Sequence, residues 1–357
     1  MEPENPAPQK VRTVVGYPKR NVADSVRLKE SYVGDEAMSF RHAGLLDLKR
    51  PYPDGKIQSF EDIEIIWLHI FEVLKVDPKK AVLFLTQPHF GHPDGNNTHM
   101  ITQAFKRLSV KGLIVCNKSV LPMYQTKKLT GLVIDSGEAY TYVTAVYRGH
   151  ALQDRVLPSP LAGARVTDVL ENLRLKQDHV LPKEAIVFEN GVFTKGPEVL
   201  FEPNLGGVAC SGLHKVACEL IQQSPEDVRK DLFGHIVLSG GNTLIRGFPA
   251  RFEKEIKDEY SQYGGKIEDI IVVAPSERDL GAWKGAVEVT KMSNFLEQCI
   301  SEYDYDVECE AVEQYKHDYG TSQSEATSSG GTIGTIQHGY VITDQTEPQL
   351  VSSVTWE

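Results

Sequence analysis

The sequence predicts an α/β fold in which helices cover layered sheets. Three observations support this prediction. Apolar residues recur at helical spacing over 61–76, which is typical of an amphipathic helix. Short runs such as 81–86 and 131–135 are apolar on both faces up to their last residue, Thr86 or Asp135, which is typical of strands buried on both faces. Such strands and helices alternate along most of the chain.

The order of the elements follows from the same patterns. Ser59 and Asp62 have the spacing of a capping box at the start of the first helix, and Pro78 ends it. The expected elements are, in chain order, a helix at 61–76, a strand at 81–86, a helix through Met100, Ala104 and Leu108, strands at 131–135 and 140–147, a helix at 162–173, a hairpin turning at 189–191, helices at 206–222 and 225–233, a strand at 235–238, a helix at 248–260, a strand at 270–273 and a mostly helical stretch at 280–299.

Length and charge narrow the functional classes. The 357 residues suit two compact domains better than one core. The chain carries 38 Lys and Arg against 49 Asp and Glu, a net charge of −11, which argues against non-specific nucleic-acid binding. Twelve of the acidic residues but only one basic residue, Lys316, lie between Met292 and Glu357, so the preceding body is neutral. We expect the acidic C-terminal region to contact a protein rather than nucleic acid or a membrane.

Other residue types exclude further classes. The five cysteines are an odd number without a CxxC pair, which predicts reduced thiols. The polar, proline-rich residues 1–10 predict a disordered lead-in and no signal peptide. The longest aliphatic runs are far shorter than a membrane span. His89, His92 and His99 lie in one polar loop without a cysteine or carboxylate set, so we expect no metal site there.

Two turns that directly follow buried strands carry the candidate binding residues. Small residues at such a turn let backbone N–H groups approach a phosphate, and an aspartate can hold the water shell of a metal ion. One such turn alone is usually only a connection. Two of them in an α/β chain predict a nucleotide held between two related domains. The candidates are Asp135, Ser136, Gly137 and Glu138 in the first turn, Gly240, Gly241 and Asn242 in the second, and Gly163 between them.

Six sequence blocks in a fixed order resemble the actin family, over about 14–305. They are Ser31–Ala37 (SYVGDEA), Leu129–Gly137 (LTGLVIDSG), Leu161–Gly163 with Thr167 and Asp168, Arg229–Leu232 (RKDL), Val237–Gly241 (VLSGG) and Ala274–Arg278 (APSER) with Trp283. The resemblance implies an actin-like, two-lobed, ribonuclease-H-type α/β fold in truncated form. It assigns residues 11–128 to an incomplete first lobe, joined by the last helices at 280–305. Residues 129–279 form a second lobe with a reduced small subdomain, and 306–357 form an extension.

The resemblance also implies a Mg-ATP or Mg-ADP site, with Asp135 facing the metal ion through water. Several positions depart from the family's pattern. The family's first phosphate loop has no counterpart, and Glu138 replaces the shorter aspartate of the second loop. Lys118 aligns with the glutamine that positions the hydrolytic water, and an ammonium group is only a donor. Asp54 aligns with the phosphate-sensing histidine and Asp279 with a lysine of the base pocket.

Two further departures concern the second lobe. Asn242 replaces the threonine that follows the paired glycines, and only a short bridge at 173–188 stands where the family has a nucleotide-contacting subdomain. We therefore expect no retained cofactor and no catalytic residues. The polar loop at 21–29 also lacks the apolar character that suits insertion into a neighbouring subunit, so we expect no self-polymerisation.

These departures predict a non-catalytic structural subunit of a larger eukaryotic assembly. Its partners would be protein subunits, with actin-related, dynein-associated or axonemal complexes as candidates, and no nucleic acid or membrane. A cytoskeletal or ciliary location in the cytoplasm is the first expectation, and a nuclear chromatin complex is the second. A nucleotide-dependent switch or weak ATPase of the same superfamily is the alternative function.

The last residues differ in composition from the body. Residues 320–331 are rich in Ser, Thr and Gly and predict a flexible linker. Residues 332–343 are β-branched and predict a hairpin or an added strand. We consider that this strand could pair with an open sheet edge of the body.

Overall fold

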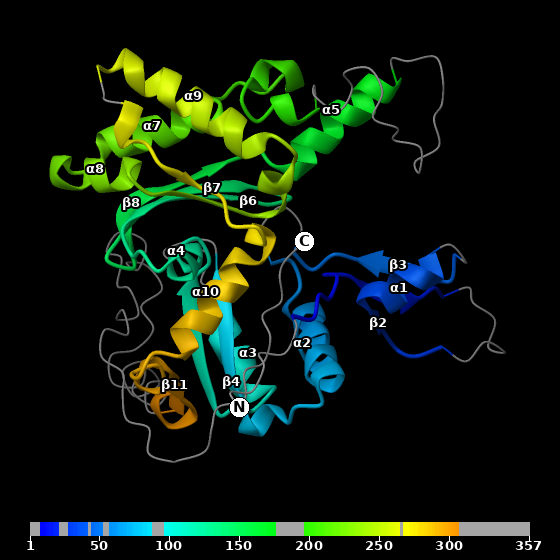
Figure 1. Cartoon of the computed structure of the whole chain (residues 1–357). Helices are drawn as coiled ribbons and strands as arrows, with labels where there is room; N and C mark the ends of the chain where they lie inside the picture. The colour runs from blue at the N-terminus through cyan, green and yellow to red at the C-terminus, as the bar shows by residue number, and fades with distance from the viewer. Residues whose placement is uncertain are drawn as a thin grey trace, which may run out of the picture.

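The computed structural model describes residues 8–20, 28–41, 44–52, 57–87, 96–175, 196–264 and 267–306. These residues form an upper lobe and a lower lobe, with a small sheet beside the lower lobe (Figure 1). Several sequence predictions fall outside the described residues: the loop at 21–27, Asp54, His89 and His92, the hairpin at 189–191 and the strand at 332–343.

The strands of the described chain belong to three sheets. They are β1 Val15–Pro18, β2 Tyr32–Val33, β3 Leu46–Lys49, β4 Val82–Gln87, β5 Gly112–Asn117, β6 Gly131–Ser136, β7 Thr141–Tyr147, β8 His150–Ser159, β9 Ile236–Ser239, β10 Val272–Val273 and β11 Ile300–Ser301.

The described helices cover these sheets. The α-helices are α1 Gly34–Arg41, α2 Phe60–Leu74, α3 Asn96–Lys106, α4 Leu121–Thr126, α5 Gly163–Leu175, α7 Leu213–Gln223, α8 Glu226–Phe233, α9 Phe248–Gln262 and α10 Gly281–Thr290. The short 3₁₀ helices are η2 Pro78–Lys80, η3 Pro203–Gly206, η4 Gly241–Leu244, η5 Ile267–Asp269, η6 Arg278–Leu280 and η7 Leu296–Gln298. None of the described helices is long and apolar enough to cross a membrane.

The upper lobe is built on a sheet with the strand order β10-β9-β6-β7-β8. Strand β6 runs parallel to β9 and antiparallel to β7. Helices α5, α7, α8 and α9 lie above the sheet in Figure 1. Their apolar sides form one core with the strands, centred on fully buried residues such as Leu132, Leu220 and Phe252. Burying these side chains is the main source of the lobe's stability.

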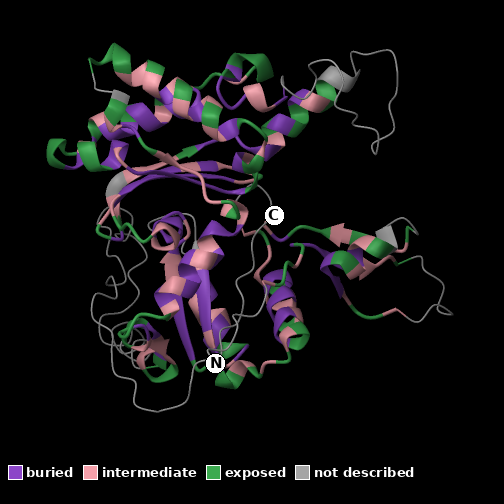
Figure 2. Cartoon of the chain, viewed as in Figure 1, coloured by how far each residue is buried: buried purple, intermediate pink, exposed green. Residues whose placement is uncertain are grey.

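The lower lobe contains the sheet β11-β5-β4, in which β4 and β5 are parallel. Helices α2 and α3 share one core with the sheet, and α10 and α4 contribute to a second core around Phe84 and Ile114. Buried residues follow the strands and the helix sides that face them (Figure 2). Helix α4 also reaches the upper lobe, where Met123 packs with Val133 and Val237 of β6 and β9. The two lobes are therefore joined by apolar packing.

A third, antiparallel sheet with the order β2-β1-β3 lies beside the lower lobe. The sequence patterns did not predict its strands, because each has only two to four residues. Tyr17 of β1 donates a hydrogen bond to the buried carboxylate of Asp62, at the start of α2. Burial of the ring raises the pKa of Tyr17, and the hydrogen bond to Asp62 raises it further. The hydrogen bond ties the small sheet to the lower lobe.

The first predicted helix is present as α2. Ser59 is its N-cap, and its Oγ accepts a hydrogen bond from Asp62 N at 3.1 Å. The helix ends at Leu74, before the expected residue 76, because Lys75 adopts a left-handed conformation with φ 54°. Pro78 instead opens the following 3₁₀ helix.

Three other boundaries differ from the prediction. The helix expected at 206–222 begins only at Leu213, because Gly207 is left-handed and ends a 3₁₀ turn and Gly212 is the N-cap. The stretch at 280–299 is helical only to Thr290 and over η7. The strand expected at 270–273 is reduced to Val272–Val273. Strands β5 and β8 were not predicted.

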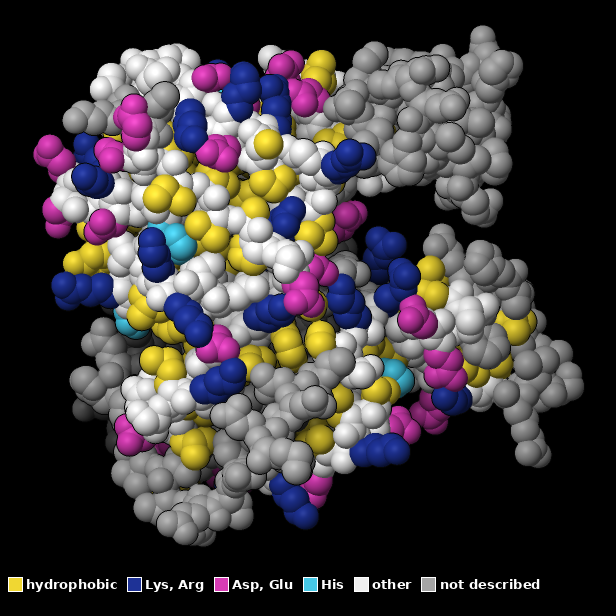
Figure 3. Space-filling model, in the orientation of Figure 1, with side chains coloured by type: hydrophobic (Ala, Val, Ile, Leu, Met, Phe, Trp, Pro, Cys, Tyr) yellow, Lys and Arg dark blue, Asp and Glu magenta, His cyan; other side chains and the backbone are white. Residues whose placement is uncertain are grey.

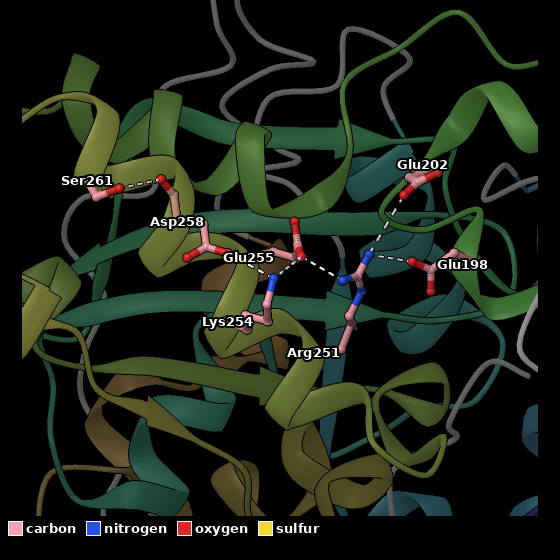
Figure 4. Close-up of polar contacts among 7 residues, drawn as sticks. All are labelled: Glu198, Glu202, Arg251, Lys254, Glu255, Asp258 and Ser261. Atoms are coloured by element: carbon pink, nitrogen blue, oxygen red, sulfur yellow. Dashed lines mark hydrogen bonds and ion pairs between the residues drawn. The ribbon is translucent and has the colours of Figure 1, made fainter.

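A charge network fastens one connecting segment of the upper lobe to α9 (Figure 4). Arg251 of α9 binds Glu198, which lies in the segment before η3, and its Nη1 contacts Glu255 Oε1 at 2.6 Å. Its guanidinium also lies 5.4 Å from the ring centre of Phe201. Lys254 continues the network along the helix and contacts Asp258 at 2.9 Å.

Candidate functional site

Parallel pairing brings the two predicted turns together. Asp135 of β6 lies opposite Ser239 of β9 in the sheet register, so the turns that follow these strands share one edge of the sheet. Ligand sites of open α/β sheets lie at the carboxyl ends of their strands. The structure thus places the turn residues predicted from the sequence side by side, near the junction of the two lobes.

Asp135 is paired with a cation from the lower lobe. Its side chain is 3% exposed, and Oδ2 lies 3.2 Å from Nζ of Lys118, which directly follows β5. A buried carboxylate needs such a partner, because an unpaired charge in the interior is costly. The sequence singled out both residues but did not indicate that they bind one another. The ammonium therefore contacts the carboxylate to which the sequence assigned the water shell of a metal ion.

The polar groups of the first turn are bonded within the chain. Ser136 Oγ lies 2.7 Å from Thr141 Oγ1, which donates to Leu161 O at 2.5 Å. Gly137 N donates to Tyr140 O at 3.1 Å and closes the turn. These bonds fix the turn against β7.

The start of α5 binds the same turn. Gly163 N and Ala164 N donate to the carbonyl oxygens of Gly137 and Glu138, each at 2.9 Å. The first N–H groups of a helix have no partner inside the helix and are a common phosphate-binding element. In this helix, two of these N–H groups already donate to backbone carbonyl oxygens of the first turn.

The second turn is joined to the first by Asn242. Its Nδ2 donates to Gly137 O at 2.6 Å and to Ser136 Oγ at 3.1 Å. Gly240 has φ 87°, and a Cβ at this position would overlap the Ser136 carbonyl. Glycine is required here by close backbone packing, whatever the turn binds. By contrast, nothing lies within 4 Å of a Cβ built at Gly241.

Two residues near the second turn complete the site. Arg278 donates to Thr243 O from Nη2 at 2.6 Å and to Pro275 O from Nη1 at 2.9 Å, which holds η6 against η4. Asp279, in the next position, forms an ion pair with Lys10 at 3.1 Å. Lys10 lies at the end of the expected lead-in, and the composition of that segment gave no signal for this contact.

This donor set does not fit a Mg-bound nucleotide. A metal ion next to Asp135 would compete with an ammonium already in contact with it, and the helix N-terminal amides and the Asn242 amide are bonded to backbone and hydroxyl oxygens. Within the described ranges, no group of three or more His, Cys, Asp and Glu side chains could hold a metal ion. The arrangement is suited to holding two turns and two lobes together.

Architecture and site together define a two-lobed α/β protein with paired turns at the lobe junction. The family model described as Actin matches residues 3–195 and 174–316, and the chain belongs to the actin family. It is 31% identical to Actin-related protein 2 of Caenorhabditis briggsae over 280 residues, which cover 66% of this chain and 70% of that protein. These matches confirm the resemblance and the actin-like fold predicted from the six sequence blocks.

Proposed function

We propose that this chain is a non-catalytic, structural actin-related subunit of a larger eukaryotic protein assembly. The observation that carries the proposal is the ion pair between Lys118 and Asp135. The carboxylate that would face a metal ion is neutralised by a side chain of the same molecule. A group that only donates hydrogen bonds also cannot accept a proton from an attacking water.

The neighbouring contacts support the absence of a cofactor. Asn242 bridges the two turns, and Gly163 and Ala164 donate to the first turn. A bound phosphate would have to displace these hydrogen bonds, and each displaced polar group would need a new partner. We therefore propose that neither Mg-ATP nor Mg-ADP is retained and that the turns serve the fold.

The proposed partners are other protein subunits, in a cytoskeletal or ciliary complex of the cytoplasm. On the face shown in Figure 3, basic and acidic side chains are interspersed, without one dominant sign. Such a surface gives no broad basic field for a phosphate backbone. A nuclear complex is the second choice. Absence of self-polymerisation rests on the polar sequence of residues 21–29, of which 21–27 lie outside the described part.

A thermal-shift titration with Mg-ATP tests the proposal. We expect an unchanged melting temperature for the full chain. A ligand that binds only the folded state would add about 2.7 kcal/mol of stability at a hundred times its dissociation constant. Each kcal/mol corresponds to roughly 2–4 °C for proteins of 150–250 residues and to a smaller shift for a longer chain.

A matched variant makes the result specific. Lys118→Gln removes the ammonium next to Asp135. If Mg-ATP raises the melting temperature of this variant but not of the unmodified chain, the ammonium excludes the nucleotide. If neither melting temperature changes, the hydrogen-bonded turns exclude it. A saturable rise in the melting temperature of the unmodified chain would overturn the proposal and favour the nucleotide-dependent switch.

A further inference from the structure

The parallel strands β4 and β5 bring two basic loops together at one end of the lower-lobe sheet. Residues 75–81 lead into β4 and residues 106–111 lead into β5. Lys111 N donates to Ala81 O at 3.0 Å, which joins the two loops directly. Five exposed lysines on these loops form what we call the lysine surface: Lys75, Lys79, Lys80, Lys106 and Lys111.

The charge of the lysine surface is largely uncompensated. Within the described chain, none of its five side chains lies within ion-pair distance of a carboxylate, whereas the neighbouring Arg107 pairs with Glu64 at 3.3 Å. The exposed acidic residues on the same loops and the end of α2 are Asp77 and Glu72. Asp77 is engaged by the backbone N–H of Lys79 at 3.1 Å. Glu302 and Asp306 are also exposed, in the turn that follows β11, but within the described chain they form no ion pair with these lysines. The five ammonium groups are therefore available to an acidic segment.

The described chain ends beside this surface. Strand β11 is antiparallel to β5, with Ser301 opposite Gly112, so the chain leaves β11 toward the loop that carries Lys111. In the helical turn that follows, buried Tyr305 stacks on Phe105 with ring centres 5.0 Å apart. The Tyr305 hydroxyl lies 3.1 Å from Thr102 Oγ1. These contacts hold the end of the described chain against α3, next to Lys106.

The sequence that follows has the complementary charge. After Asp306 come Glu308, Glu310 and Glu313, and the next Lys or Arg in the sequence is Lys316. Seven residues reach about 20 Å when extended, which is enough to cross the ends of neighbouring strands. Because the segment is tethered two residues before its first glutamate, its effective concentration at the surface is on the order of millimolar.

We propose that residues 307–313 dock on the lysine surface of the same molecule. Ion pairs between exposed side chains are individually weak and screened by salt. Several pairs formed by a tethered segment act together, so docking is favoured at low ionic strength and is released as salt rises. The acidic start of the extension thereby covers the end of the lower-lobe sheet. This inference is independent of the proposed loss of nucleotide binding.

Zero-length carbodiimide crosslinking of the full chain, followed by mass spectrometry, tests the proposal. The reagent joins only carboxylates and amines already in contact. We expect crosslinks from Glu308, Glu310 or Glu313 to the lysine surface at low salt and their loss at about 1 M salt, where the screening length is about 3 Å. Lys215, an exposed lysine of α7 in the upper lobe, is the internal control and should form none.

Two further measurements separate the outcomes. A mixture of ¹⁴N- and ¹⁵N-labelled chains distinguishes links within one molecule from links between copies. The variant Lys79→Glu with Lys80→Glu and Lys111→Glu should speed hydrogen exchange over residues 307–313, whereas Lys215→Glu should leave it unchanged. Links formed only between copies, absence of links at low salt, or equal exchange in both variants would each overturn the proposal.

Discussion

At the scale of single residues, the site is governed by how buried charges are satisfied. Asp135 could keep its charge in the interior by contact with a hydrated metal ion or with a cationic side chain. Lys118 provides the second solution at 3.2 Å, while its own side chain is 26% exposed and stays partly hydrated. Removing one partner of such a pair costs more than removing both, because the remaining charge stays buried.

His235 predicts a pH dependence of stability. It is 5% exposed, and its Nε2 lies 2.9 Å from Thr126 Oγ1, which donates to Met123 O. Burial, aided by nearby Lys128, lowers the pKa of His235 to about 4 from an ordinary value near 6.5. The unfolded chain therefore binds a proton between pH 6.5 and 4 that the folded chain does not. Stability is complete above pH 6.5 and falls as the pH drops toward 4.

The measurement is the free energy of unfolding in urea at several pH values. The slope due to this residue approaches about 1.4 kcal/mol per pH unit inside the window. His235→Gln keeps a donor for Thr126 but does not titrate, so its curve should be flatter by that amount. Parallel curves for the two proteins would contradict the assignment.

At the scale of elements, Arg251 decides whether the segment before η3 stays on α9. It binds Glu198, which lies 53 positions earlier in the chain, and Glu255, which lies one helical turn further along α9. Arg251→Gln should cost about 2 kcal/mol, as expected for hydrogen bonds between charged groups. Hydrogen exchange over 196–208 should rise more than exchange elsewhere in the upper lobe.

A neighbouring lysine gives the control for this prediction. Lys254 lies on the same helix and pairs with Glu255 and Asp258, both of which belong to α9. Lys254→Gln should change stability much less than Arg251→Gln does, because ion pairs between exposed side chains contribute little. Equal exchange over 196–208 in both variants would show that Arg251 does not anchor the segment.

The elements also show what a sequence can predict. Helix α2 follows from periodicity, because its residues at helical spacing, such as Ile63, Ile66 and Ile70, face a core. Strand β6 follows from its apolar run, because it is buried at every position. The start of α7 was misplaced, because the left-handed turn at Gly207 interrupts the helical pattern. The two turns of the site follow from small residues after buried strands. The partners Lys118 and Lys10 do not, because only the tertiary fold brings them to their aspartates.

At the scale of the whole molecule, ion pairs of the described chain cross between the lobes. One joins Lys284 of α10 to Glu277 at the start of η6, and two others end on aspartates of the candidate site. Lys118 and Lys10 lie on the lower-lobe side, where Val11 packs against the core next to Lys10. Their partners Asp135 and Asp279 belong to β6 and η6 of the upper lobe. Together with the packing of α4, these pairs connect the two lobes without a ligand. We therefore expect them to set how far the lobes open.

Small-angle X-ray scattering of a triple variant tests this expectation. Lys118→Gln with Asp135→Asn removes one pair without leaving a buried charge, and Lys10→Gln removes the other. The radius of gyration should rise by on the order of 1 Å, against about 21 Å for a compact chain of this size. Arg12→Gln breaks the exposed pair with Asp35 at 2.6 Å, which does not cross between the lobes, and should leave the scattering unchanged. If the triple variant also scatters like the unmodified chain, these two ion pairs do not set the separation of the lobes, because the apolar packing at α4 and the remaining contacts hold the junction without them.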